Sequence, residues 1–343
     1  MSFEEITGNI ANLSPMMQKY LETKEQYKDC ILFYRLGDFY EMFFDDALTA
    51  SKVLEITLTG KNCGLEERAP MCGVPFHSVE PYITKLIENG YKVAICEQVE
   101  DPKLAKGLVK REVTRIVTPG TNIDSMSLDE NSNNYLMSVF IYLNNIGFSI
   151  CDVTTGDFYL SEITGIRNLF DEIYKYKPAE IICNSQFLSS GLDIEELKTK
   201  TGTQISCLDD YYFEENSCKK TILKHFKVHS LVGMGLDDYE LGIIAAGSLL
   251  TYLNETQMIH LNHITQLNPT SNGVYMVIDN ATRRNLELTE TMRDKQKRGS
   301  LLWVLDKTKT AMGARTLRTM TQQPLVNKDM IEERLDAVEY FFN

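Results

Sequence analysis

The chain has 343 residues, of which 43% are hydrophobic and 24% charged, and its net charge is −13. This length predicts about two or three domains with hydrophobic cores of their own. The acidic balance argues against a protein that binds nucleic acid over its whole surface, although it permits one small basic face. The first residues lack the pattern of a signal peptide, and no apolar run is as long as a membrane span. We therefore expect a cytoplasmic protein.

The cysteines show no C-x-x-C spacing, and most of them lie in apolar runs. A chain of this length without a disulfide framework is expected to keep its thiols buried and reduced. The residues concerned are Cys30, Cys63, Cys72, Cys96, Cys151, Cys183, Cys207 and Cys218.

The first segment, 1–120, alternates helical and strand-like patterns, which predicts a small α/β domain. The expected helices begin at Pro15 and cover 46–54 and 79–88, and the expected strands cover 30–35, 56–59 and 92–97. Pro119 and Gly120 then interrupt the strand-like pattern, and we assign the stretch 121–134 to a linker.

The second segment, 135–265, begins with strand-like runs joined by short turns, which is the pattern of a meander. The runs cover 136–143, 147–154 and 156–162, followed by a helix over 166–176, a strand over 179–183 and a helix over 237–256. This order predicts a mixed sheet covered by helices. The third segment, 266–343, has helical patterns over 281–292, 301–306, 312–320 and 331–342. Because the sequence stops within a helical pattern, we expect it to be part of a longer protein.

The most informative stretch is residues 33–47, which read FYRLGDFYEMFFDDA. If this backbone is extended, Phe39 and Glu41 point to one face and Tyr40 points to the other. An aromatic ring beside a carboxylate is unusual on a protein surface. From these residues alone, a Phe39 in the core and a solvated Glu41 are the simpler interpretation.

This stretch resembles the mismatch-reading motif of the MutS family of DNA mismatch-repair proteins. Further blocks resemble the same family in the same order, at 69–77, 93–102, 115–121, 278–287 and 305–313. The resemblance implies a multidomain α/β protein. It would comprise a small mixed α/β mismatch-binding domain over 1–120, a ribonuclease-H-like α/β connector domain over 135–265, and the beginning of an all-α core or lever domain over 266–343.

The resemblance implies that Phe39 enters the minor groove at a mispaired or unpaired base and that Glu41 hydrogen-bonds the displaced base. Inserting an apolar wedge costs unstacking energy, least where pairing has already failed. Stacking a ring on a base returns about 1–3 kcal/mol. We expect Glu41 to add discrimination, since in sound duplex its charge faces phosphates without that hydrogen bond.

Basic side chains of the first segment are candidates for contacts with the DNA backbone. They are Lys61, Arg68, His77, Lys103, Lys106, Lys110 and Arg111. We favour Lys61, because it follows a predicted strand where members of the family often carry a basic contact. The others also fit solvated surface positions, and His77 equally fits a structural histidine. The basic residues of the third segment are assigned to helix surfaces and contacts between domains, namely Arg283, Arg284, Lys295, Lys297 and Arg298.

The second segment leaves an alternative from another functional class. Residues 151–157 are similar to the first strand of ribonuclease-H-like folds, in which an aspartate binds a catalytic metal. Two-metal cleavage needs converging carboxylates, and Asp152, Asp157 and Glu172 are the candidates. We interpret Asp152 as structural. A metal-dependent nuclease is one alternative, and a MutS-like interaction scaffold is another, although the intact Phe39–Glu41 motif argues against the scaffold.

No G-x-x-x-x-G-K-S/T sequence occurs in the chain, so no P-loop for ATP is expected here. We expect the chain itself to have no enzymatic activity, cofactor or metal. The resemblance implies that the full-length protein is a DNA-dependent ATPase, with ATP and magnesium in a C-terminal domain. It also implies mismatched double-stranded DNA as ligand, a homodimer, and a MutL-type repair partner bound through the connector domain. The protein would be bacterial, associated with the nucleoid when on DNA and without a membrane partner.

Overall fold

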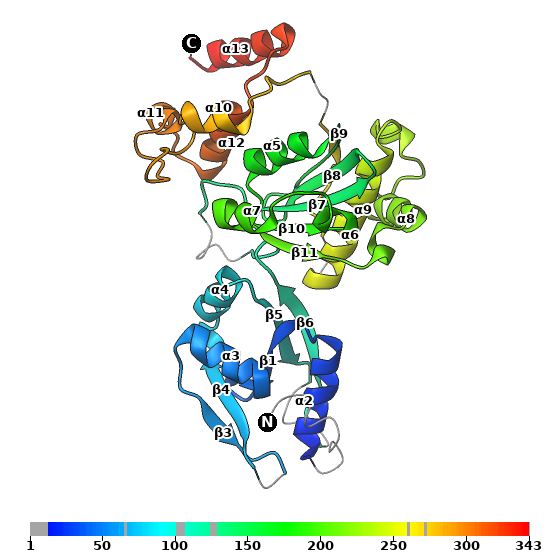
Figure 1. The fold of residues 1–343 in the computed structure, drawn as a ribbon, viewed down its shortest axis with the longest axis vertical. Helices are drawn as coiled ribbons and strands as arrows, with labels where there is room; N and C mark the ends of the chain where they lie inside the picture. The colour runs from blue at the N-terminus through cyan, green and yellow to red at the C-terminus, as the bar shows by residue number, and fades with distance from the viewer. Residues whose placement is uncertain are drawn as a thin grey trace. The chain divides into compact units, whose positions relative to one another are not determined.

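The computed structural model describes residues 13–64, 67–100, 107–123, 129–258, 261–270 and 273–342. It divides into two compact units, Met1–Ser127 with Tyr252–Leu261, and Leu128–Thr251 with Asn262–Asn343. In the described residues, each unit contains one six-stranded sheet (Figure 1).

The sheet of the first unit has the strand order β3-β4-β2-β1-β5-β6. Its strands are β1 (Cys30–Leu36), β2 (Phe39–Phe43), β3 (Thr59–Lys61), β4 (Ala69–Pro75), β5 (Lys92–Gln98) and β6 (Arg111–Val117). β1 and β5 are parallel, and the other neighbours are antiparallel. Leu36 pairs with Phe39, so β1 and β2 form a tight hairpin around Gly37 and Asp38. Gly37 has a φ of +60°, a left-handed conformation that glycine adopts without strain.

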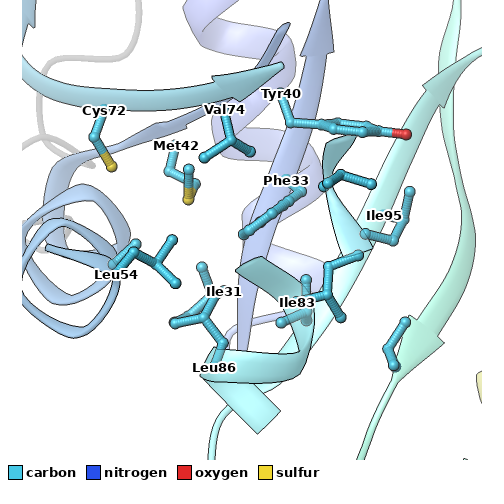
Figure 2. Packing of buried hydrophobic residues seen from close by; sticks show 14 of the residues in the cluster. Ile31, Phe33, Tyr40, Met42, Leu54, Cys72, Val74, Ile83, Leu86 and Ile95 are labelled. Atoms are coloured by element: carbon cyan, nitrogen blue, oxygen red, sulfur yellow. The ribbon is translucent and has the colours of Figure 1, made fainter. Parts of the chain in front are cut away.

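Helices cover both faces of this sheet (Figure 1). They are α2 (Pro15–Gln26), α3 (Phe44–Leu54) and α4 (Glu80–Glu88). On one face Phe33, Tyr40 and Met42 pack with apolar residues of α3 and α4, as Figure 2 shows. On the other face Tyr34 and Phe43 pack with apolar residues of α2. A central strand that is buried on both sides explains the uninterrupted apolar run of β1.

A buried ion pair joins α2, α3 and β1. Lys24 Nζ lies 2.9 Å from Asp46 Oδ1, and both side chains are about nine-tenths buried. The N–H of Leu32 donates to Asp46 Oδ2 at 2.9 Å, and Lys24 also donates to the carbonyl of Cys30 at 2.5 Å. Burial raises the pKa of Asp46, and the Lys24 charge opposes that rise. Removing either partner would therefore leave a charged group buried without its counter-ion.

The second unit is built on a sheet with the order β11-β10-β7-β8-β9-β12. Its strands are β7 (Tyr135–Tyr142), β8 (Asn145–Asp152), β9 (Asp157–Thr164), β10 (Glu180–Cys183), β11 (Gln204–Cys207) and β12 (Asn268–Pro269). β7, β8 and β9 form an antiparallel meander, whereas β10, β11 and β12 pair in parallel with their neighbours. The predicted meander and mixed sheet are thus confirmed.

Helices pack on both faces of the second sheet as well (Figure 1). They are α5 (Ile166–Tyr176), α6 (Ser185–Leu188), α7 (Ile194–Thr201), α8 (Glu215–Phe226) and α9 (Glu240–Gln257). The start of α9 lies directly against β8 at Gly147, where an added Cβ would come within 2.1 Å of the Leu241 backbone. Glu162 fixes this helix start by accepting the N–H groups of Leu241 and Gly242 at 2.6 and 2.9 Å. Because the backbone of α9 lies this close, position 147 of β8 requires a glycine.

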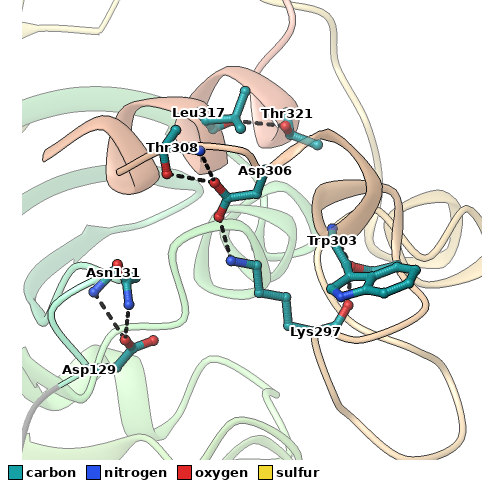
Figure 3. Close-up of polar contacts among 9 residues, drawn as sticks. Asp129, Asn131, Lys297, Trp303, Asp306, Thr308, Leu317 and Thr321 are labelled. Atoms are coloured by element: carbon teal, nitrogen blue, oxygen red, sulfur yellow. Dashed lines mark hydrogen bonds and ion pairs between the residues drawn. The ribbon is translucent and has the colours of Figure 1, made fainter. Parts of the chain in front are cut away.

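The third segment is helical and belongs to the second compact unit. Its helices are α10 (Asn280–Asn285), α11 (Leu301–Leu305), α12 (Ala311–Gln322) and α13 (Lys328–Phe342). Arg283 links α10 to α12 by donating to the carbonyl of Gln322 at 2.7 Å. The carboxylate of Asp306 accepts hydrogen bonds from Lys297 at 2.5 Å and from the Thr308 hydroxyl at 2.6 Å (Figure 3). These donors hold the pKa of Asp306 well below its ordinary value.

The predicted fold class is confirmed, with two mixed α/β sheets followed by helices. Several local predictions were wrong. β2, β4 and β6 were not predicted as strands, and the strand expected over 56–59 begins only at Thr59. The helix expected over 281–292 ends at Asn285 because Glu287 has a φ of +47°. The loop that follows is closed by a hydrogen bond from the Thr291 N–H to the Gln296 carbonyl at 2.9 Å.

All eight cysteines are free thiols, as predicted, and seven are buried. Cys207, at the end of the edge strand β11, is exposed and so departs from the prediction. Across the described ranges, no helix combines the length and the apolar character that crossing a membrane requires.

Candidate functional site

Phe39 is the first residue of β2 and follows the Gly37–Asp38 turn directly. Its side chain is 47% exposed, whereas Tyr40, Met42 and Phe43 of the same strand are buried. The simpler interpretation of Phe39 as a core residue is therefore wrong. β2 is extended, as assumed, so Phe39 and Glu41 lie on one face. That face also carries Phe43, which packs against α2.

Glu41 is not a freely solvated charge. Its carboxylate accepts a hydrogen bond from Lys61 Nζ, and the two side chains are 16% and 32% exposed. Lys61 ends β3, and its ammonium group also lies 5.6 Å from the centre of the Phe43 ring. Gly73 of β4 pairs with Glu41 of β2, and a Cβ on Gly73 would lie 3.5 Å from Glu41 Cγ. The site thus presents a half-exposed ring beside a carboxylate whose charge Lys61 balances.

A second exposed aromatic side chain lies at the same end of the sheet. Phe39 pairs with Pro75 in the sheet, and the exposed Phe76 follows Pro75 directly. His77 is also exposed, and its ring meets the Phe76 ring edge to face at 5.5 Å. This end of the sheet therefore carries two exposed phenylalanines.

The remaining basic candidates differ in their surroundings. Arg68 is exposed, and it precedes Ala69, which pairs with Lys61. Lys110 is exposed and forms an ion pair with Glu112 at 2.5 Å, and the carboxylate raises the pKa of Lys110. Arg111 donates to the carbonyls of Arg35 and Val109 at 2.7 and 2.8 Å, which is a structural role. Lys103 and Lys106 lie outside the described residues.

Sequence reasoning missed a cluster of polar and aromatic side chains next to the Gly37–Asp38 turn. Arg35, Tyr40 and Glu97 come from β1, β2 and β5 and contact one another, and Arg35 also contacts the exposed ring of Phe76. Arg35 Nη1 lies 3.6 Å from Glu97 Oε2, and the Tyr40 hydroxyl donates to Glu97 Oε1. The only sequence signal for this cluster was that Arg35 and Glu97 fall inside two of the family-like blocks.

The candidate carboxylates of the second unit, Asp152, Asp157 and Glu172, are each bound by protein groups, and Asp157 accepts a hydrogen bond from the Thr155 hydroxyl at 2.8 Å. Asp152 is fully buried and accepts hydrogen bonds from Asn133 Nδ2 at 2.8 Å and from the N–H and hydroxyl of Thr154 at 2.9 and 2.7 Å. Glu172 instead pairs with Lys175 at 2.8 Å. Within the part of the chain that the structure describes, no group of three or more His, Cys, Asp or Glu residues is placed to hold a metal ion. This geometry supports a structural role for Asp152.

Comparison with known proteins gives the family. The models of MutS domain I, MutS domain II and MutS domain III match residues 14–126, 134–265 and 281–343, in that order. The DNA mismatch repair protein MutS of Lachnoclostridium phytofermentans is 62% identical over 329 residues, which are 96% of this chain and 35% of that protein. Those of Acetivibrio thermocellus and Ruminiclostridium cellulolyticum are 56% and 54% identical, over 97% of this chain and 38% of each relative. The chain therefore spans little more than a third of the length of these relatives. Since the three domain models together match most of its residues, it belongs to the MutS family of DNA mismatch-repair proteins.

Proposed function

We propose that this chain reads mispaired or unpaired bases in duplex DNA by inserting Phe39 from the minor groove, with Glu41 as hydrogen-bonding partner of the displaced base. The observation that carries the proposal is the half-exposed Phe39 ring, which lies on the same face of β2 as Glu41 at the end of the sheet. An apolar ring of this size gains nothing from water, and it is available for stacking before any DNA is bound.

The energetics favour a defect over sound duplex. Inserting a ring unstacks a base step, and this cost is smallest where a base is mispaired or unpaired. Stacking the ring on a base returns about 1–3 kcal/mol, whatever the base, because every base has a π-face. The net free energy is therefore favourable at a defect and unfavourable in intact duplex, which is the discrimination that mismatch repair needs.

Lys61 resolves the conflict of placing a carboxylate near phosphates. In the free protein its ammonium group neutralises Glu41. We propose that on DNA Lys61 turns toward the phosphate backbone, while Glu41 hydrogen-bonds the displaced base. Arg68 and His77 are exposed in the same unit and are candidates for further backbone contacts.

Other activities of the full-length protein are also proposals, and they rest on membership of the family. We propose that this chain acts by binding and that ATP and magnesium are bound by another part of the full-length protein. We also propose that the full-length protein forms a homodimer and engages a MutL-type partner through the second unit.

Fluorescence anisotropy at stated salt concentrations tests the DNA proposal, because such affinities depend strongly on salt. The chain, its Phe39→Ala variant and a Tyr142→Ala control are compared on matched duplex and on duplex with one unpaired thymine. Tyr142 is an exposed aromatic residue of the second unit. We expect a preference for the unpaired thymine that Phe39→Ala abolishes and Tyr142→Ala retains. If Phe39→Ala keeps the full preference, the proposed role of the ring is wrong.

A further inference from the structure

We propose that Arg35 is a positioning residue for Phe39. It would hold the turn between β1 and β2 in the conformation that presents the ring, and it would act through the protein rather than through a DNA phosphate. The inference rests on the proposed role of Phe39. It concerns an arginine that the DNA-contact candidates did not include.

The Arg35 side chain contacts the Gly37–Asp38 turn directly. Its Nε donates to the carbonyl of Gly37 at 2.5 Å. Its guanidinium carbon lies 3.4 Å from the centre of the Phe76 ring and 5.6 Å from that of Tyr40. The side chain is only 14% exposed. A planar guanidinium group that stacks on a ring and donates in its own plane uses the two properties that distinguish arginine from lysine.

The turn is also tied to β4, and Arg35 completes this connection. The N–H of Phe76 donates to the carbonyl of Asp38 at 3.0 Å. Arg35 binds Gly37 and stacks on Phe76, so both residues of the turn are held to the segment that follows β4. Phe39 comes next in the chain and pairs with Leu36 and Pro75. Its backbone is therefore fixed on both sides before DNA arrives.

The charge of Arg35 is balanced within the protein. Glu97 Oε2 lies 3.6 Å from Arg35 Nη1, and the other oxygen of Glu97 accepts the Tyr40 hydroxyl. Burial raises the pKa of Tyr40 well above its ordinary value, so the hydroxyl keeps its proton at neutral pH. A phosphate contact by Arg35 would have to displace both Glu97 and the Phe76 ring. These contacts argue for a positioning role.

The consequence is preorganisation of the wedge. A ring that is already held in its binding conformation loses little conformational entropy on insertion, whereas a mobile turn must be ordered at that step. Loosening the turn should weaken binding to a defect on the order of tenfold. Binding to matched duplex, which does not use the ring, should not change.

The test is Arg35→Lys, which keeps the charge but loses the planar donor and the stacking face. Arg115→Lys is the matched control, because Arg115 lies in the same unit but pairs with Glu80 at 2.9 Å instead of holding the turn. Binding is measured at several salt concentrations on matched duplex and on duplex with one unpaired thymine. Hydrogen exchange of the protein without DNA is measured for residues 36–39 and for the N–H of Phe76.

We expect Arg35→Lys to speed exchange in the turn and to weaken defect binding about tenfold, with the affinity and salt slope on matched duplex unchanged. In the Phe39→Ala background it should have no further effect on defect binding. Unchanged exchange in the turn overturns the inference, whatever the DNA results. A phosphate contact would instead leave Arg35→Lys like the parent, while Arg35→Met would lower the salt slope by about 0.9. If the turn loosens but Phe39→Ala retains its preference for the defect, positioning stands and the proposed function fails.

Discussion

The buried pair of Lys24 and Asp46 should dominate the stability of the first unit. Asp46→Ala leaves the Lys24 ammonium without its counter-ion and the Leu32 N–H without its acceptor. Breaking a buried ion pair by removing one partner costs about 3–5 kcal/mol. Leaving the Leu32 N–H without an acceptor costs about 1–3 kcal/mol. The range of about 3–5 kcal/mol for the broken ion pair already includes part of this cost. We therefore expect Asp46→Ala to lower the free energy of unfolding of this unit by about 3–5 kcal/mol.

The assay must report on this unit alone. The only tryptophan, Trp303, lies in the second unit, so its fluorescence follows a different transition. Native-state hydrogen exchange of residues 30–36 follows the first unit instead, since β1 is its central strand. Asp45→Asn, at the exposed neighbouring carboxylate, is the control and should cost less than about 1 kcal/mol. The double variant Lys24→Met with Asp46→Leu should recover part of the loss, because it removes the unpaired charge but still leaves the Leu32 N–H without its acceptor. A change below about 1 kcal/mol for Asp46→Ala would refute this reasoning.

Three further predictions concern the site and its surroundings. Phe39→Ala should change the thermal stability of the first unit by less than about 1 kcal/mol, because the ring is half-exposed; a large drop in a calorimetric scan would place the ring in the core. Lys61→Met should weaken binding to matched duplex and lower its salt slope by about one, and adding Glu41→Gln should restore part of the affinity, because the carboxylate is then no longer left unpaired. If Lys61→Met has the same effect in the parent chain and in the Glu41→Gln background, this coupling is wrong. Burial raises the pKa of Tyr34 from 10.0 to about 12, so its contribution to stability is complete below pH 10 and is lost as the pH rises toward 12. Circular-dichroism melts over that range should show a weaker pH dependence for Tyr34→Phe, and an equal dependence would contradict the assignment.

Elements with a clear periodicity could be predicted from the sequence. Ile166–Tyr176 is helical over the predicted range, because its apolar residues recur at helical spacing and its flanks break the helix. β4 was missed because it contains Pro70, Gly73 and Pro75, residues that usually mark loops. β2 was missed as a strand because it is only five residues long and three of its side chains are buried, so it shows no alternation.

Some features of the candidate site could also be predicted from the sequence, whereas others could not. Extended geometry predicts that Phe39 and Glu41 share a face, but the exposure of the ring depends on the turn and on where the sheet ends. The ion pair of Glu41 with Lys61 joins residues 20 positions apart, and the contact of Tyr40 with Glu97 joins residues 57 apart. Such pairs arise from the strand order β3-β4-β2-β1-β5, which periodicity does not contain. Only the resemblance to a family pointed to Phe39 in advance.

The central claim is that the Phe39 ring stacks on a base at the defect. The most direct measurement uses duplex with one unpaired thymine and the fluorescent base 2-aminopurine beside it, whose emission responds to stacking. At saturating protein we predict a change in emission with the parent chain, and with Tyr142→Ala, that is absent with Phe39→Ala. Bound Phe39→Ala protein that changes the emission as the parent does would contradict the account.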